Sequence, residues 1–176
     1  MKLYVTRHGE TEWNAQNKIC GITDVELTDR GRSQARELGE KLMSCRIDLI
    51  VSSPLKRALE TSRLIESGRG IPIETDPRLT EQNYGIYEGA DRGNEGFLSN
   101  KRLFAFRYPG GESMMGVAHR TYGLIEELKE ECHDRAVLLV CHGGVCRVIN
   151  TYFRDMTNDE FFRYSLGNCV LEEYEL

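Results

Sequence analysis

The chain has 176 residues, of which 40% are hydrophobic and 29% are charged, and it carries a formal net charge of −5. This balance is typical of a folded globular domain and excludes a disordered or fibrous chain. The acidic net charge gives no general attraction to nucleic acid or anionic lipid, so neither a nucleic acid nor a membrane is expected as a partner.

Strands and helices alternate along the chain. Two runs, 47–53 and 135–142, are apolar almost without interruption, as strands buried in a parallel sheet are. Apolar residues recur every three or four positions within 31–42 and 117–128, which indicates amphipathic helices. This alternation predicts a three-layer α/β/α fold with a mostly parallel central sheet. The expected strands, of which the last is an edge, are residues 2–6, 47–53, 71–76, 135–142 and 169–176.

A further helix is expected directly after the strand at 47–53. Ser53 is placed to cap this helix, and Pro54 then occupies the first helical position, where its missing N–H does no harm. Arg57 falls in the first turn. The sequence therefore brings a cation close to the end of a buried strand.

One domain is expected at this length, spanning residues 1–176. Residues 85–112 interrupt the alternation with many glycines and charged residues, and no internal repeat or low-complexity segment is present. We expect residues 85–112 to form a short lid-like excursion from the domain.

The cysteines and the N-terminal residues bear on the compartment and on metal binding. The apolar stretch in MKLYVTRHGE is too short for a signal peptide, and no later stretch has membrane-spanning length, so a cytoplasmic location is expected. The six cysteines are then expected to stay reduced. They include no CxxC pair, and the four histidines have no ligand spacing around them, so we expect neither a metal nor another cofactor.

Basic residues follow three of the expected strands where each strand ends. Arg7 and His8 follow the first, Arg57 follows the second across a two-serine turn, and His142 follows the third, just before a glycine pair. Ligands of open α/β sheets bind outside the carboxyl ends of the strands. If these strands are neighbours, two arginines, two histidines and the amides of a helix N-terminus form an anion site, suited above all to a phosphoryl group.

Each of these residues also has an ordinary interpretation. A lone Arg7 or His142 at a strand end is more often a surface residue, and Arg57 alone would be an exposed helix residue. Glu81 alone would be a solvated loop carboxylate. Only their joint occurrence favours a site.

Six sequence blocks occur in an order that resembles the histidine phosphatase superfamily, also called the phosphoglycerate mutase-like family. An isolated RHG is weak evidence, whereas six ordered blocks over nearly the whole chain are strong. The blocks are RHGET (7–11) followed by WN, LTDRGRSQA (27–35), SSPLKRALET (52–61), LTEQNYGIYEG (79–89), PGGES (109–113) and VCHGGV (140–145).

The resemblance implies the phosphoglycerate mutase-like fold and a catalytic role for five residues. The first histidine is the nucleophile in that family, which places a phosphohistidine intermediate on His8. Phosphate-holding roles fall on Arg7, Arg57 and His142, the last donating its bond as an imidazolium. Glu81 would protonate the leaving oxygen and then take a proton from water.

The resemblance also implies further substrate-binding residues around this centre. Gly143 follows the second histidine, and Asn14 lies farther from the phosphate. Glu112 and Ser113, from the PGGES block, are expected at the rim. Three more cations either meet a second anionic group of the substrate or face solvent, the second interpretation being favoured: Lys101, Arg102 and Arg107.

The expected activity is metal-independent hydrolysis of a small phosphorylated substrate by a histidine phosphatase. Three alternatives stay open. The family includes mutases, although the short excursion at 85–112 favours a phosphatase. The stretch CHGGVCR also fits the C-x-x-G-x-x-R loop of cysteine-based phosphatases, with Cys141 as nucleophile and Arg147 as phosphate clamp. A non-catalytic phospholigand-binding module is the third. These residues predict neither the oligomeric state nor which phosphomonoester is the substrate.

Overall fold

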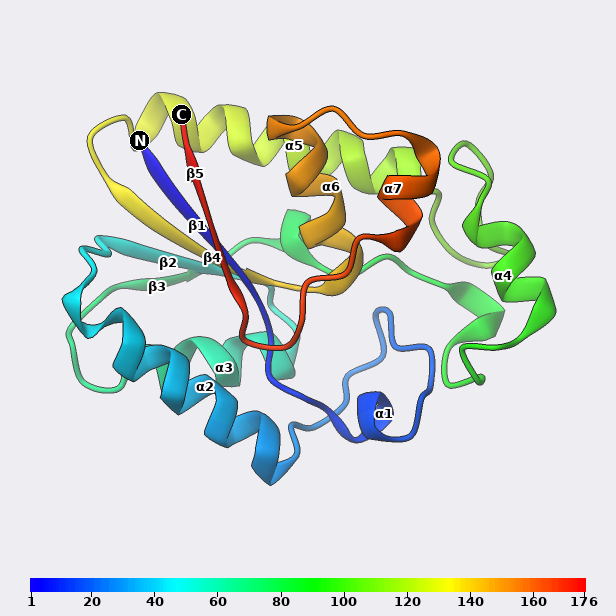
Figure 1. The fold of residues 1–176 in the computed structure, drawn as a ribbon, viewed down its shortest axis with the longest axis horizontal. Helices are drawn as coiled ribbons and strands as arrows, with labels where there is room; N and C mark the ends of the chain where they lie inside the picture. The colour runs from blue at the N-terminus through cyan, green and yellow to red at the C-terminus, as the bar shows by residue number, and fades with distance from the viewer.

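The computed structural model describes residues 1–176 and is built around a five-stranded sheet with the order β3-β2-β4-β1-β5 (Figure 1). β4 pairs with β1 and with β2 in parallel, β2 pairs with β3 in parallel, and β5 runs antiparallel to β1 at the edge. The expected α/β fold with a mostly parallel sheet is therefore confirmed. The strands are β1 (Lys2–Arg7), β2 (Leu49–Ser52), β3 (Ile73–Thr75), β4 (Ala136–Cys141) and β5 (Leu171–Glu175).

Helices cover both faces of the sheet, with α2 and α3 on one face and α5 and α6 on the other (Figure 1). α4 lies at one end of the molecule, away from the sheet. The helices are α1 (Glu12–Ala15), α2 (Asp29–Lys41), α3 (Lys56–Glu66), α4 (Glu95–Lys101), α5 (Met114–Glu131), α6 (Gly143–Phe153) and α7 (Asn158–Arg163). Three short 3₁₀ helices complete the chain: η1 (Leu42–Ser44), η2 (Pro77–Leu79) and η3 (Gly85–Tyr87).

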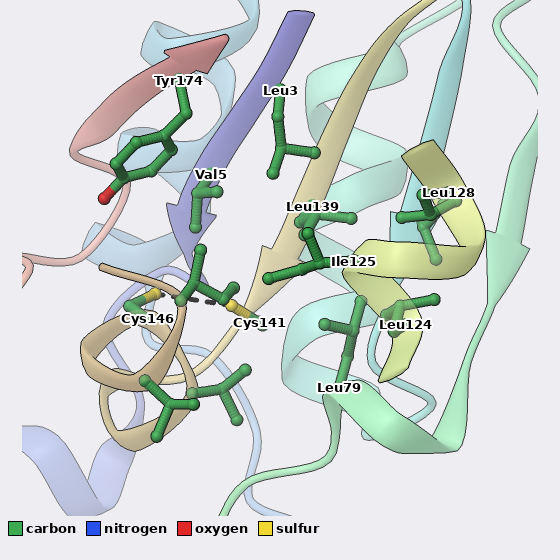
Figure 2. Packing of buried hydrophobic residues seen from close by; sticks show 14 of the residues in the cluster. Leu3, Val5, Leu79, Leu124, Ile125, Leu128, Leu139, Cys141, Cys146 and Tyr174 are labelled. Atoms are coloured by element: carbon green, nitrogen blue, oxygen red, sulfur yellow. Dashed lines mark hydrogen bonds between the residues drawn. The ribbon is translucent and has the colours of Figure 1, made fainter. Parts of the chain in front are cut away.

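The side chains of β4 alternate between two hydrophobic cores because successive residues of a strand point to opposite faces. Leu139 packs with residues of α5, whereas Leu138 packs with residues of α2 and α3. Figure 2 shows Leu139 facing Ile125 and Leu124 of α5. Leu139 is fully buried, and truncating such a residue to alanine costs about 2–5 kcal/mol. The parallel sheet is thus fixed by both layers.

The start of α3 differs from the expectation. The helix begins at Lys56, its N-cap is Leu55 without a side-chain cap, and Pro54 lies before it. The Lys56 N–H instead donates a hydrogen bond to the Asp24 carboxylate at 2.9 Å. The prediction that Ser53 caps the helix was wrong: the backbone amide that its hydroxyl accepts, at 3.4 Å, is that of Leu55, which lies ahead of the first helical turn. Arg57 does lie in the first turn, as predicted.

The register of the sheet aligns the carboxyl ends of three strands. Arg7 pairs with Cys141 across β1 and β4, and Ser52 pairs with Val140 across β2 and β4. The residues one step beyond each strand therefore emerge at the same edge, with β4 in the middle. This edge is where a ligand of an open α/β sheet binds.

All six cysteines are free in the structure, and Cys141 and Cys146 lie in the core with their sulfurs 3.4 Å apart (Figure 2). None of the helices combines the length and the apolar character needed to cross a membrane.

Candidate active site

A pocket of about 140 Å³ opens at the carboxyl ends of β1 and β4. Fourteen residues line it, and only four of them are hydrophobic, so the pocket suits a polar ligand. The lining residues are Arg7, His8, Asn14, Ile19, Cys20, Glu81, Tyr84, Arg92, Phe97, Lys101, Gly143, Gly144, Arg147 and Ser165.

His8 follows β1 and is held in one tautomer. Its Nδ1 lies 2.7 Å from the Gly9 carbonyl oxygen, which only an N–H can bond, and its Nε2 accepts a bond from Arg57 Nε at 3.3 Å. Burial lowers the pKa of His8 well below its usual range, and the charges of Arg57 and Arg7 lower it further. His8 is therefore a neutral imidazole whose Nε2 carries the lone pair.

Arg57 lies between the two histidines and is almost fully buried. Its Nε–H donates to His8 Nε2 and to His142 Nδ1, at 3.3 and 3.2 Å. Its terminal nitrogens donate to the carbonyl oxygens of Thr23, at 2.8 Å, and Gly21, at 2.6 Å. Arg57 thus lies against Nε2 of His8, outside the pocket lining, with its donors bonded within the protein.

His142 follows β4 and is completely buried. Its Nδ1 accepts from Arg57, so its Nε2 carries the hydrogen and donates to the Ser53 hydroxyl at 2.8 Å. Burial, then the charge of Arg57, lowers the pKa of His142 well below its usual range. This corrects the expected imidazolium: His142 is neutral here, because a second buried cation beside Arg57 would be too costly.

Arg7 provides the cation that faces the pocket. Its NH1 donates to the Leu166 carbonyl oxygen at 3.4 Å, while its buried Nε has no partner in the protein. Burial lowers the pKa of the Arg7 guanidinium from its ordinary value. A buried donor without a partner costs free energy unless a ligand bonds it. Arg7 is therefore prepared to bond an anion in the pocket.

Glu81 reaches the same pocket from the loop after η2. Its Oε2 accepts the Gly144 N–H at 2.9 Å, and its Oε1 accepts the Gln82 N–H at 2.9 Å. These two backbone bonds fix the Glu81 carboxyl group in the pocket lining. A Cβ on Gly144 would lie 2.5 Å from Glu81 Oε1. The place of Glu81 therefore requires glycine at 144.

The structure separates the outer substrate-binding candidates into two groups. Asn14 and Gly143 line the pocket. Glu112 and Ser113 do not line it: the Glu112 carboxylate bonds both Nε and NH2 of Arg120, at 2.9 and 3.0 Å, and Ser113 is the N-cap of α5. Their polar atoms are used to fix the start of α5 rather than to meet a ligand.

Three cations line the pocket beyond the sequence blocks: Arg92, Lys101 and Arg147. None of the three forms an ion pair with a carboxylate. Burial lowers the pKa of Lys101, and the charges of Arg147 and Arg92 lower it further. Arg102 and Arg107 are exposed and lie outside the lining. Sequence analysis missed Arg92, whose only signal was a charge in the glycine-rich excursion.

The cysteine-phosphatase arrangement is not formed. Cys141 is fully buried in the core and does not line the pocket. The Arg147 guanidinium donates from Nε and NH2 to the Tyr164 carbonyl oxygen, at 3.2 and 3.0 Å. The thiol and its expected clamp therefore do not share a phosphate-sized space. The structure also has no group of three His, Cys, Asp or Glu side chains able to hold a metal ion.

The fold and the pocket agree with a comparison against protein-family models. The model of the Histidine phosphatase superfamily (branch 1) matches residues 3–176. The protein belongs to the histidine phosphatase superfamily, as the resemblance of its sequence blocks predicted.

Some relatives are named as mutases and others as phosphatases. The chain is 31% identical to a 2,3-bisphosphoglycerate-dependent phosphoglycerate mutase of Cytophaga hutchinsonii, covering 98% of this chain and 86% of that protein. It is 35% identical to an uncharacterized phosphatase, PhoE, of Bacillus subtilis, covering 84% and 74%. The solved structure of the alpha-ribazole phosphatase of Shigella flexneri is similar with a TM-score of 0.89 at 27% identity, covering 100% and 91%. The family is thus one of phosphoryl-transfer enzymes.

Proposed function

We propose that the protein is a metal-independent phosphomonoester hydrolase that forms a phosphohistidine on His8. The observation that carries this proposal is the state of His8, a neutral ring in the pocket lining whose Nδ1–H is held by Gly9. Attack on phosphorus needs a nitrogen lone pair and a cation for the phosphoryl oxygens, and Arg7 supplies a buried, unpartnered donor in the same pocket.

The proposed reaction has two steps. In the first, Nε2 of His8 attacks phosphorus while the bond to the ester oxygen breaks, and that oxygen takes a proton from Glu81. In the second, water attacks phosphorus and gives a proton to the Glu81 carboxylate, and the electron pair of the N–P bond returns to Nε2. Arg7 and the Gly143 amide at the start of α6 hold the phosphoryl oxygens.

Arg57 and His142 support the nucleophile in this proposal. The Arg57 Nε–H that bonds His8 Nε2 in the free protein is placed to bond a phosphoryl oxygen once that nitrogen is phosphorylated. His142, itself bonded to the Ser53 hydroxyl, holds the Arg57 guanidinium in place. The positive charge near the transferred group then comes from Arg7 and Arg57, which removes the need for a metal ion.

Mutase-type phosphoryl transfer is the second candidate function. Arg92, Lys101 and Arg147 line the pocket without carboxylate partners, which supports a substrate with a second anionic group such as a carboxylate. A phosphoglycerate, the substrate class in the name of the Cytophaga hutchinsonii relative, has that composition. The pocket therefore supports a small, doubly anionic phosphomonoester for either activity.

Phosphate release from a panel of phosphomonoesters, measured with a chelator present, tests the hydrolase. The expected result is turnover by the unaltered protein and an acid-labile phosphoenzyme, both lost in His8→Ala by a factor on the order of 10⁴ or more. His119→Ala, an exposed histidine of α5, is the matched control and keeps full turnover. Full turnover in His8→Ala would refute the nucleophile, and dependence on added metal would refute metal independence.

Two further measurements separate the remaining alternatives. Cys141→Ser keeps its turnover under this proposal, whereas a cysteine mechanism would lose it. Incubation with 2,3-bisphosphoglycerate and a phosphoglycerate distinguishes the transferase from the hydrolase: recovery of the phosphoryl group on the acid indicates a mutase, and its recovery as inorganic phosphate indicates a phosphatase. Tight phosphate binding without any transfer would indicate a binding module.

A further inference from the structure

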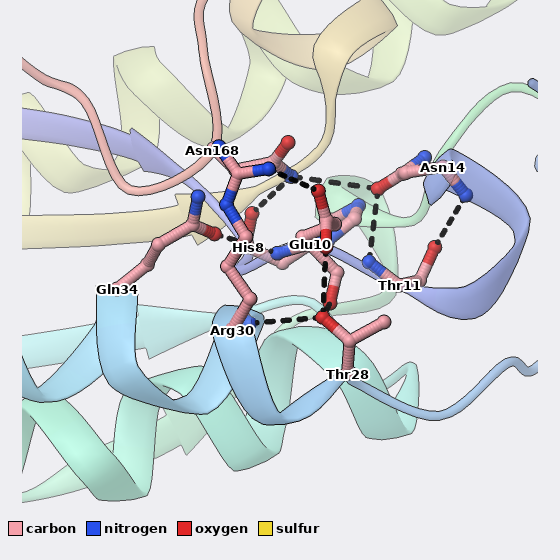
Figure 3. A network of polar contacts seen from close by, with 9 residues as sticks. His8, Glu10, Thr11, Asn14, Thr28, Arg30, Gln34 and Asn168 are labelled. Carbon is pink, nitrogen blue, oxygen red and sulfur yellow. Dashed lines mark hydrogen bonds and ion pairs between the residues drawn. The ribbon is translucent and has the colours of Figure 1, made fainter.

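We infer that Asn168, near the end of the chain, is a positioning residue that fixes the Asn14 side chain as a hydrogen-bond donor to the substrate phosphoryl group. The inference rests on the proposed function. One side-chain amide, Nδ2 of Asn168, donates to the His8 carbonyl oxygen at 2.8 Å and to Asn14 Oδ1 at 3.4 Å (Figure 3). It therefore joins the backbone of the nucleophile to a residue of the pocket lining.

The Asn14 amide has one orientation that satisfies its neighbours. Its Oδ1 accepts the Thr11 N–H at 3.2 Å as well as the bond from Asn168. In the opposite orientation the Asn14 Nδ2, itself a donor, would face two other donors, the Thr11 N–H and the Asn168 Nδ2. Because Oδ1 is held on the protein side, Nδ2 is the polar atom of this side chain that remains for the pocket, which Asn14 lines. Asn14 thus offers an N–H donor, not an oxygen, to an anion.

Asn168 is itself anchored to the strand that carries His8. The Cys169 amide donates to the Arg7 carbonyl oxygen at 2.9 Å, and Asn168 forms an isolated bridge with Arg7. The His8 N–H in turn donates to the carbonyl oxygen of Cys141 in β4 at 3.0 Å. The His8 backbone is thus fixed by its N–H through β4 and by its C=O through Asn168, at the point where the chain leaves the sheet.

A double-mutant cycle tests this role through the binding of inorganic phosphate, measured by calorimetry. Asn14→Ala and Asn168→Ala are each expected to weaken phosphate binding about tenfold. In the double variant the two factors do not multiply, because Asn168 acts on phosphate through Asn14. Factors that multiply in full, or an Asn168→Ala variant that binds phosphate as the unaltered protein does, would overturn the inference.

Asn168→Asp provides a sharper second variant of nearly the same size. It replaces the Nδ2 donor with an oxygen that faces two acceptors, the His8 carbonyl oxygen and Asn14 Oδ1. The Asn14 side-chain amide is therefore expected to flip, and phosphate binding is expected to weaken more than in Asn168→Ala. Asn158→Asp, exposed at the start of α7, is the control for the added charge and keeps phosphate binding. A loss of binding no larger than that of the control would count against the inference.

Loss of phosphate binding and loss of hydrolysis lead to different conclusions in these experiments. If the unaltered protein binds phosphate but hydrolyses no phosphomonoester, the proposed function is lost, while the cycle still decides the role of Asn168. If the unaltered protein binds no phosphate, the inference about Asn168 is overturned. If both hold, Asn168→Ala is expected to raise KM and to leave the pH profile of kcat unchanged, since Glu81 does not contact Asn168 or Asn14.

Discussion

Two regions meet at the pocket, and they differ in how deeply their side chains are buried. At the strand ends His8, Arg57 and His142 are no more than 3% exposed, and all their ring nitrogens and the Arg57 guanidinium have partners. In the excursion at 85–112, Lys101 has no ion pair, and four of the eight exposed large hydrophobic side chains of the protein lie on this one segment: Ile86, Leu98, Leu103 and Phe106.

Under the proposed function, this difference separates chemistry from recognition. Catalytic groups must be held close to their productive geometry, and the buried bonds among the strand-end residues would do this. Recognition groups tolerate change and are placed on loops, where substitutions alter few other contacts. Substitutions at the strand ends should therefore affect every substrate, whereas substitutions in the excursion should affect some substrates more than others.

Arg57→Met is expected to have the largest effect of the changes below. It removes the donor shared by both histidines, and kcat/KM should fall by about 10²- to 10³-fold for all substrates. The carbonyl oxygens of Gly21 and Thr23 also lose their donors, so the free energy of unfolding should fall by about 2 kcal/mol. Arg63→Met, exposed on the same helix, is the control and should change neither quantity. Equal effects of the two variants would remove the distinction between the two regions.

Gly144→Ala is expected to lower kcat by about 10- to 100-fold, because the new Cβ displaces Glu81. The loss should be larger for alkyl phosphates, which need a proton on the leaving oxygen, than for nitrophenyl phosphate, which does not. Gly123→Ala, in α5 with open space around its Cα, is the control, and its kcat should be unchanged. A loss that is the same for both classes of substrate would contradict the role assigned to Glu81.

Stability should decrease as the pH falls below about 6.5. The pKa values of His8 and His142 are well below 6.5 in the folded protein and return to about 6.5 on unfolding. Between these values the unfolded chain binds more protons, so the free energy of unfolding falls with the pH, by up to about 1.4 kcal/mol per pH unit for each histidine. Urea unfolding from pH 7.5 to 5 measures this slope. His8→Asn should reduce it, and an unchanged slope would show that His8 is not buried neutral.

Arg92→Ala and Lys101→Ala should have the smallest effects. Each is expected to raise KM about 3- to 10-fold for phosphomonoesters that carry a carboxylate, with little change for nitrophenyl phosphate and in the unfolding free energy. Arg102→Ala, which removes an exposed cation outside the pocket lining, is the control and should leave both KM values alone. If all three variants behave alike, these cations do not form a recognition surface.

Sequence analysis could place residues that depend on strand ends and parallel register. Arg7, His8 and His142 follow buried apolar runs, and adjacent parallel strands bring such positions together. The role of Ser53 was misjudged, because capping preference is a local property while its partner His142 lies 89 residues away. Arg92 and Asn168 were missed for a related reason: neither belongs to a motif. Only the folded chain brings Arg92 into the pocket lining and Asn168 against the His8 backbone.

The position of β1 in the sheet also determines when the site can form during synthesis. β1 is the first strand of the chain, yet both of its neighbours, β4 and β5, come from residues 136–175. The backbone groups of β1 therefore stay unpaired until most of the chain has left the ribosome. Pairing between segments so far apart in the sequence must also close long loops. A nascent chain that ends before β4 holds His8 on an unpaired strand. The nucleophile of the proposed reaction therefore reaches its place in the site only as the last strands join the sheet.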